Sequence, residues 1–233
     1  MTPLPETSRS RISTCGIADM YLDAKSAVIS AGFASEIDWL AGLRFGDLTE
    51  SWFLREAAWV VLSSGIAEHV VRSRFAAISG AFMEFESANT ICANSKCCRR
   101  RALAHFRHVG KIDAILGIAV TVSQLGFLRL KSRIGSERVA FLQTLPYVGP
   151  TTCFHLAKNI GLNVAKPDRH LLRIAAAMGY SCPGTMCEAI SDVVGDTVAV
   201  VDVVLWRYAT LRRDYLTALA GIEVPQATLR RPS

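Results

Sequence analysis

Residues 145–152 constrain the architecture of this chain most tightly, and they read Leu145-Pro146-Tyr147-Val148-Gly149-Pro150-Thr151-Thr152. A helix expected over residues 136–144 cannot continue through Pro146, and Gly149 allows the backbone a tight turn. Pro150 suits the first turn of the next helix, because its missing N–H would have no partner there. That helix is expected to end at Gly161. The stretch therefore predicts two helices joined by a short hairpin.

The hairpin is expected to place backbone N–H groups at the start of a helix. The amides of Gly149, Thr151 and Thr152 would be free there, and the positive end of the helix dipole adds to their attraction for an anion. A phosphate suits this arrangement well. A plain corner between two packed helices uses the same kind of sequence, so the residues that follow decide between the two interpretations.

A single carboxylate follows the hairpin, in the segment Lys166-Pro167-Asp168-Arg169-His170. A new helix is expected over residues 171–178, so the ordinary structural role of Asp168 is an N-terminal cap. Pro167 restricts the backbone before it, and Lys166, Arg169 and His170 surround it with positive charge. This setting favours a functional carboxylate and a hairpin that binds phosphate.

The rest of the chain reads almost entirely as helix. Apolar residues recur at three- and four-residue spacings over residues 52–61, with Thr49 or Ser51 available as an N-cap. A break is expected at residues 63–65. Further helices are expected through residues 70–78, 102–108 and 112–125.

Residues 198–204 are the one ambiguous segment. Their β-branched side chains favour a strand by propensity. No partner strand is visible elsewhere in the sequence, and a lone strand leaves its backbone groups without hydrogen bonds. We therefore expect a buried helix here and an all-α fold for the chain.

The chain carries 26 Lys and Arg against 20 Asp and Glu, and this net charge of +6 suits a polyanionic partner. No acidic residue lies between Glu86 and Asp113. The basic residues of this run are Lys96, Arg99, Arg100, Arg101, His105, Arg107, His108 and Lys111. A second cluster consists of Arg129, Lys131 and Arg133. A solvated helix face explains any one of these residues, but the whole run favours a surface that follows a phosphate backbone.

The seven cysteines show no Cys-x-x-Cys spacing and no companion His at zinc-finger distance. Their odd number, without an export signal, argues against a disulfide framework, so we expect free thiols and no metal. No segment reaches the roughly 18 uninterrupted apolar residues of a membrane-spanning helix. Residues 1–15 read as a loose leader without the apolar core of a secretory signal. We expect a cytoplasmic protein with no membrane partner, associated with the nucleoid if the source is prokaryotic.

Together, the hairpin and the aspartate resemble the helix-hairpin-helix DNA glycosylases of the endonuclease III superfamily. The family hairpin reads leucine-proline-glycine-valine-glycine, which residues 145–149 match at four of five positions. Its aspartate, before x-His, is matched by Pro167-Asp168-Arg169-His170. Residues 53–67, FLREAAWVVLSSGIA, look like the family's early helix and the loop after it, which probes DNA from the minor groove. The resemblance covers most of residues 50–175.

The resemblance implies two helical lobes with a catalytic cleft between them. Residues 51–160 would form a helical barrel that carries the hairpin, and residues 1–50 would pair with residues 161–233. Asp168 would be the catalytic residue. The expected DNA contacts are Leu145, Tyr147, Val148, Gly149, Thr151, Thr152, Lys166, Arg169 and His170, with Ser64, Gly65 and Ile66 as the wedge that fills the gap left by a flipped base. The partner would be double-stranded DNA bound by a monomer.

Three departures from the family pattern shape the expected activity. Tyr147 replaces the first hairpin glycine, and its ring could stack on a sugar. Thr151 stands where lyase-competent members carry a Schiff-base lysine, which favours a monofunctional enzyme that uses water. Only Cys182 and Cys187 lie where the family has four cysteines, so no iron–sulfur cluster is expected. The resemblance does imply a monovalent cation at the hairpin carbonyls, and no other cofactor.

Two alternatives stay open. A bifunctional glycosylase/lyase would use Lys158 or Lys166 in place of the missing lysine. A non-catalytic DNA-binding module would keep the hairpin alone, although such a module gains nothing from a carboxylate that faces phosphates. The sequence leaves open whether the base is damaged, mismatched or hypermodified, and hence whether the role is repair or defence against phage DNA.

Overall fold

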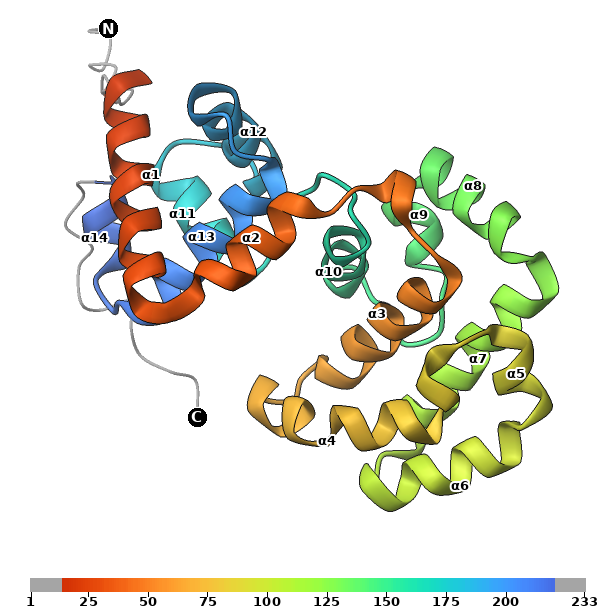
Figure 1. The fold of residues 1–233 in the computed structure, drawn as a ribbon. Helices are drawn as coiled ribbons and strands as arrows, with labels where there is room; N and C mark the ends of the chain where they lie inside the picture. Colours follow the sequence, from red (N-terminus) through yellow and green to blue (C-terminus); the bar gives the residue numbers. More distant parts are fainter. Residues whose placement is uncertain (1–13, 221–233) are drawn as a thin grey trace, which may run out of the picture. The chain divides into compact units, whose positions relative to one another are not determined.

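Helices make up the regular structure of residues 14–220, the part of the chain that the computed structural model describes, and no strand occurs there (Figure 1). The expected all-α fold is confirmed. The loose leader expected over residues 1–15 lies outside the described residues, except that helix α1 begins at Thr14.

The chain divides into two compact units. Unit 1 comprises residues 1–41 and 165–233, and unit 2 comprises residues 42–164. The sequence placed the two boundaries after residues 50 and 160, whereas the structure places them after residues 41 and 164. The segment with the 3-10 turn Phe45–Asp47 therefore belongs to the same unit as the hairpin.

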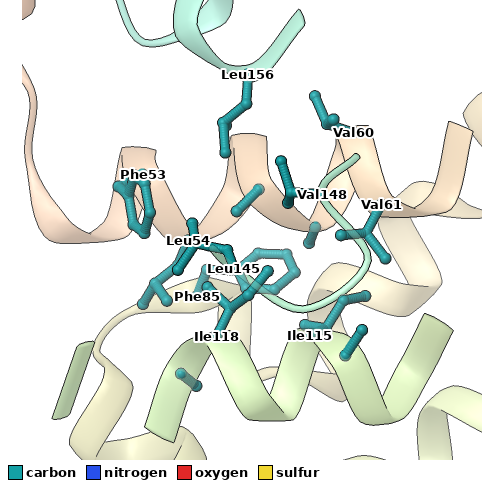
Figure 2. Packing of buried hydrophobic residues seen from close by; sticks show 14 of the residues in the cluster. Phe53, Leu54, Val60, Val61, Phe85, Ile115, Ile118, Leu145, Val148 and Leu156 are labelled. Atoms are coloured by element: carbon teal, nitrogen blue, oxygen red, sulfur yellow. The ribbon is translucent and has the colours of Figure 1, made fainter. Parts of the chain in front are cut away.

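Unit 2 is an assembly of eight α-helices around one apolar core. They are α3 (Glu50–Ser63), α4 (Glu68–Ala81), α5 (Ala88–Ala93), α6 (Ser95–His105), α7 (Val109–Leu125), α8 (Phe127–Glu137), α9 (Val139–Leu142) and α10 (Thr152–Asn159). Figure 2 shows the centre of this core, where the hairpin residues Leu145 and Val148 lie between α3 and α7.

Local sequence signals explain most of these boundaries. Thr49 caps α3, because its hydroxyl accepts a hydrogen bond from the Trp52 N–H at 3.2 Å. The expected break at residues 63–65 is confirmed, with Gly65 at φ 71°. Residues 102–108 were expected to be one helix, but α6 begins earlier, at Ser95, and ends at His105.

The helix expected over residues 136–144 is interrupted at Arg138 and ends early, at Leu142. Helix α8 ends at Glu137, and Arg138 then adopts φ 53° and ψ −128°, which breaks the helical path. Only the four residues of α9 precede the hairpin as helix. Packing of Ile134 and Phe141 into the core on both sides of the break outweighs the local helix propensity.

Unit 1 contains α1 (Thr14–Val28), a π-turn (Ile29–Phe33), α2 (Ala34–Gly42), α11 (Arg169–Ala177), α12 (Pro183–Val194), α13 (Val198–Leu211) and α14 (Tyr215–Ala220). The expected buried helix over residues 198–204 is confirmed as the first half of α13. Helix α1 packs against α13 and α12, so segments far apart in the sequence lie together in unit 1. Asp196, in the turn before α13, links this turn to α1, because it accepts hydrogen bonds from Tyr21 Oη at 2.6 Å and Lys25 Nζ at 2.7 Å.

No single helix within residues 14–220 combines the length and the apolar composition needed to cross a bilayer. The pair α7 and α8 meets that criterion only when joined, and the two helices are bent by 102° relative to each other.

Candidate functional site

The hairpin of unit 2 is closed by its own hydrogen bonds. The Val148 N–H donates to the Leu145 carbonyl at 3.1 Å, and the Cys153 N–H donates to the Gly149 carbonyl at 3.0 Å. The Gly149 N–H donates to Thr152 Oγ1 at 2.6 Å. The Gly149 amide is therefore not free, contrary to the prediction. The amides of Thr151 and Thr152 have no hydrogen-bond acceptor within the described residues. Two unpaired N–H donors therefore lie at the start of helix α10.

Tyr147 supplies the left-handed residue of the turn. Its φ is 65°, while Gly149 is not among the glycines of positive φ in the described chain. A non-glycine residue in this region costs roughly 1–2 kcal/mol, so neighbouring contacts must hold it. The ring stands edge-on to the His108 ring, with centroids 6.0 Å apart, and lies 5.2 Å from Lys111 Nζ. A Cβ at Gly110 would lie 3.3 Å from the Tyr147 ring.

Two hairpin residues expected to contact DNA are buried. The side chains of Leu145 and Val148 are 4% and 3% exposed and pack in the core of unit 2 (Figure 2). Their side chains therefore fix the turn and are not available to a ligand. Tyr147 is 47% exposed, so it is the hairpin side chain best placed for an external contact.

Lys111 is not part of a phosphate-binding surface, contrary to the prediction. Its side chain is buried, and Nζ donates to the carbonyls of Val61, Leu62 and Ser64, the last at 2.7 Å. These carbonyls end helix α3, where no intrahelical donors remain. Burial lowers the pKa of Lys111. Because Tyr147 covers the same ammonium group, Lys111 links the hairpin to the turn that follows α3.

That turn contains the expected wedge residues Ser64, Gly65 and Ile66. Gly65 is exposed at its tip, and the Ile66 N–H donates to the Ser63 carbonyl at 3.3 Å. The Ile66 side chain packs on the core of unit 2. The structure thus brings the expected wedge and the hairpin together around Lys111, with Gly65 as the most accessible point.

The exposed face of α6 and the short segment that follows it carry the basic run. The exposed cations are Lys96, Arg100, Arg101 and Arg107, and none of them forms an ion pair or hydrogen bond within residues 14–220. Arg99 is bound to Asp113 at 2.6 Å. The chain leaves α6 through Phe106 and Arg107 and reaches His108 beside Tyr147, so this face, the α6 basic face, adjoins the hairpin.

Two of the three cations of the second basic cluster are bound to other groups of unit 2, contrary to the prediction that the cluster forms a phosphate-binding surface. Lys131 donates to the carbonyls of Gly46 and Leu48 at 2.6 and 2.9 Å, and Arg133 pairs with Glu137 at 2.7 Å. Only Arg129 stays exposed without such a partner among the described residues. The basic surface is therefore narrower than the sequence suggested.

Charge is divided unequally between the two units. Unit 2 contains 15 Lys and Arg against 8 Asp and Glu, a net charge of +7. Unit 1 contains 11 against 12, a net charge of −1. The whole positive excess of the protein belongs to the unit with the hairpin.

Asp168 lies in unit 1, at the start of α11. Its Oδ1 accepts hydrogen bonds from the N–H groups of His170 at 2.9 Å and Leu171 at 3.1 Å, so it caps the helix as its position predicts. No hydrogen bond reaches Oδ2 within residues 14–220. The carboxylate is half-buried, so one oxygen is fixed by the backbone and the other is available.

The side chains of Arg169 and His170 form no hydrogen bond or ion pair with Asp168 among the described residues. The His170 ring packs against Tyr215, with Nδ1 3.4 Å from the phenol oxygen, and burial lowers the pKa of His170. Arg169 Nε donates to His170 Nε2 at 3.3 Å. Lys166 contributes backbone to the loop: its N–H donates to Asp202 at 2.6 Å.

The two candidate lyase lysines differ in accessibility. Lys158 on α10 is buried at 8% exposure, so its amine cannot reach a sugar without opening the core. Lys166 is half-buried. Thr151, at the position of the family lysine, is exposed at the start of α10.

Within residues 14–220, no group of three or more His, Cys, Asp and Glu side chains could hold a metal ion. Cys182 is exposed and Cys187 is buried, and neither forms a disulfide. The hairpin carbonyls of Leu145 and Gly149, where the resemblance implies a monovalent cation, each accept a backbone hydrogen bond.

Sequence reasoning missed two residues of this site. The sequence groups Lys111 with the surface cations and assigns no role to Asp202. A signal existed for the second, because Asp202 is the one acidic residue in the apolar run of α13. No family model, curated protein or solved structure matches this chain.

Proposed function

We propose that this protein is a monofunctional DNA glycosylase. It binds double-stranded DNA as a monomer in the cytoplasm, flips a damaged or modified base out of the stack and hydrolyses its N-glycosidic bond, without a cofactor. The observation that carries the proposal is Asp168, whose Oδ1 is fixed by two backbone amides while Oδ2 is left available.

Unit 2 supplies the features expected for DNA binding. The amides of Thr151 and Thr152 open α10, and an anion is favoured at a helix N-terminus. The α6 basic face extends from the hairpin and carries four unpaired cations. Helix α6 has 11 residues and is therefore about 16 Å long, which corresponds to roughly five base pairs of duplex.

The chemistry requires a carboxylate that stays in place while positive charge develops. The C1′–N bond breaks, a C1′–O bond forms to water, and the proton that water loses ends on the released base. Positive charge on the sugar rises as the first bond lengthens. Asp168 stabilises that charge and orients the water, and its fixed geometry means that little reorganisation is needed.

Loss of the negative charge of Asp168 tests the assignment directly. Duplexes that carry alkylated, oxidised, deaminated or glucosylated bases are incubated with the protein, and released bases are identified by mass spectrometry. For the base that is released, Asp168→Asn is expected to slow release by about 10²–10³-fold, the usual effect of removing one electrostatic contact to a transition state. Binding of the same duplex is expected to be unchanged.

Two results would contradict this assignment. Equal rates for wild-type protein and Asp168→Asn would remove Asp168 from the chemistry. Binding of every duplex without release of any base would favour the non-catalytic DNA-binding module.

A borohydride trapping experiment separates hydrolysis from lyase chemistry. Thr151 cannot form a Schiff base and Lys158 is buried, so no covalent adduct is expected on DNA with an abasic site. An adduct that is lost in Lys166→Gln would show instead a bifunctional enzyme that uses Lys166.

A further inference from the structure

Asp202 is a buried carboxylate in the middle of α13. Its exposure is 1%, and the residues around it on the helix are buried and apolar. A buried charge is costly unless hydrogen bonds compensate it. Its retention among valines therefore calls for a specific partner.

One such partner is the loop that carries Asp168. Asp202 Oδ2 accepts a hydrogen bond from the backbone N–H of Lys166 at 2.6 Å, across 36 residues of sequence. Residues 162–168 form neither helix nor strand, so their amides have no regular ladder to hold them. A hydrogen bond to a charged acceptor is stronger than a neutral one, which suits it to fixing such a loop.

The hydrogen bond is two residues from Asp168, and the chain between them is stiff. The Lys166 carbonyl accepts the Asp168 N–H at 2.8 Å, and Pro167 lies between them with a restricted φ. The Asp168 side chain is bound in turn to the start of α11. Asp202 therefore fixes the backbone on one side of Asp168, and α11 fixes the side chain on the other.

We propose that Asp202 is a positioning residue for Asp168, which it holds in place through the Lys166 amide. The inference rests on the proposed function. Asp202 does not touch DNA and takes no part in proton transfer. Its loss changes the placement of the Asp168 carboxylate, so it affects the chemical step and leaves DNA binding intact. A misplacement of about 1 Å can cost roughly 100-fold in rate.

Two substitutions weaken the hydrogen bond between Asp202 and the Lys166 amide to different extents. Asp202→Asn keeps an oxygen acceptor without the charge, and Asp202→Ala removes the acceptor. We expect kcat for base release to fall by about 3- to 10-fold in the first and about 10- to 100-fold in the second, with KM for the duplex within twofold of the wild-type value. Hydrogen exchange at the Lys166 amide should accelerate in the same order.

Asp196→Ala is the matched control, because Asp196 is a second acidic anchor of unit 1 that binds Tyr21 and Lys25 and not the loop. It should lower the melting temperature and leave both kcat and Lys166 exchange unchanged at temperatures where it is folded. If Asp202→Ala does not fold, Asp202→Asn carries the test alone.

The inference is overturned if Asp202→Asn exchanges faster at Lys166 but keeps the wild-type kcat, or if Asp196→Ala lowers kcat equally. A wild-type protein that releases no base overturns the proposed function and this inference with it. Normal release by wild-type and both Asp202 variants overturns the inference alone.

Discussion

Unit 2 and unit 1 differ in net charge, and under the proposed function this difference separates the unit that attracts DNA from the unit that carries the catalytic carboxylate. Unit 2 has a net charge of +7 and contains the hairpin and the α6 basic face, whereas unit 1 has a net charge of −1 and contains Asp168. Cations attract a polyanion over a long range. The positive excess therefore lies in the unit that we propose binds DNA, and Asp168 lies in the unit without it.

The units also differ in the charge that each one buries. Unit 2 buries Lys111, whose ammonium group binds carbonyls at the end of α3. Unit 1 buries Asp202, which accepts an N–H from the loop before α11. In both cases a buried charge fixes a turn next to a candidate functional element. The cation of Lys111 binds carbonyl oxygens, and the carboxylate of Asp202 binds an N–H group. Each charge therefore has the sign that its backbone partners require.

Lys111→Met should affect unit 2 alone. It leaves three carbonyls at the end of α3 without their donor and removes the contact with Tyr147, so we expect a loss of about 3 kcal/mol. The melting temperature should fall by about 6–12 °C. Hydrogen exchange should accelerate around residues 61–66 and 145–149 while α13 stays protected. Equal acceleration in both units would show that the two do not respond separately.

Arg100→Gln with Arg101→Gln should weaken binding to an undamaged duplex. Two lost phosphate contacts reduce the slope of log K against log salt by about 2, and the affinity at 0.1 M salt by roughly 30- to 100-fold. Fluorescence anisotropy over a salt series measures both. Arg129→Gln with Arg213→Gln removes the same charge from α8 and from unit 1, and should change little. Equal effects of the two pairs would mean that net charge alone drives binding.

Asp196→Ala should affect unit 1 alone. The substitution removes the acceptor of Tyr21 and Lys25 and releases α1 from the turn before α13, which should cost roughly 1–2 kcal/mol. Exchange should accelerate in α1 and leave α3 and α7 protected. Salt-dependent binding of duplex should be unchanged, because no cation of the α6 basic face is involved.

Glu56→Gln should stabilise unit 2 at high pH. Burial raises the pKa of Glu56 from its ordinary value of 4.5, although Asn159 donates to it at 2.9 Å. The folded state therefore binds this proton more tightly than the unfolded state, and stability falls as the pH rises from about 4.5 through the raised pKa.

Glutamine resembles the protonated acid, so the variant should melt higher at pH 8, by about 2–4 °C for each kcal/mol regained. The difference should vanish below pH 4. A variant that melts lower at pH 8 would show that the charged form stabilises the fold.

Sequence reasoning recovered much of the helical fold where short-range signals operate. Thr49 caps α3, Asp168 caps α11, and the Pro146 region ends one helix before another begins. Each of these depends on hydrogen bonds or restrictions within a few residues. Arg138 shows the limit: nothing local marks the break there, and the packing of the helices on either side imposes it.

The sequence by itself determined most of the helices, the hairpin, the cap by Asp168 and the excess of positive charge, because these follow from neighbouring residues and composition. Tertiary structure decided that Lys111 is buried, that Tyr147 takes the left-handed turn position, that Lys131 binds the carbonyls of Gly46 and Leu48, and that Asp202 accepts a hydrogen bond from the Asp168 loop. Those outcomes depend on which distant surfaces pack together. The sequence around a lysine or an aspartate does not show whether its side chain faces solvent or binds backbone groups in the interior.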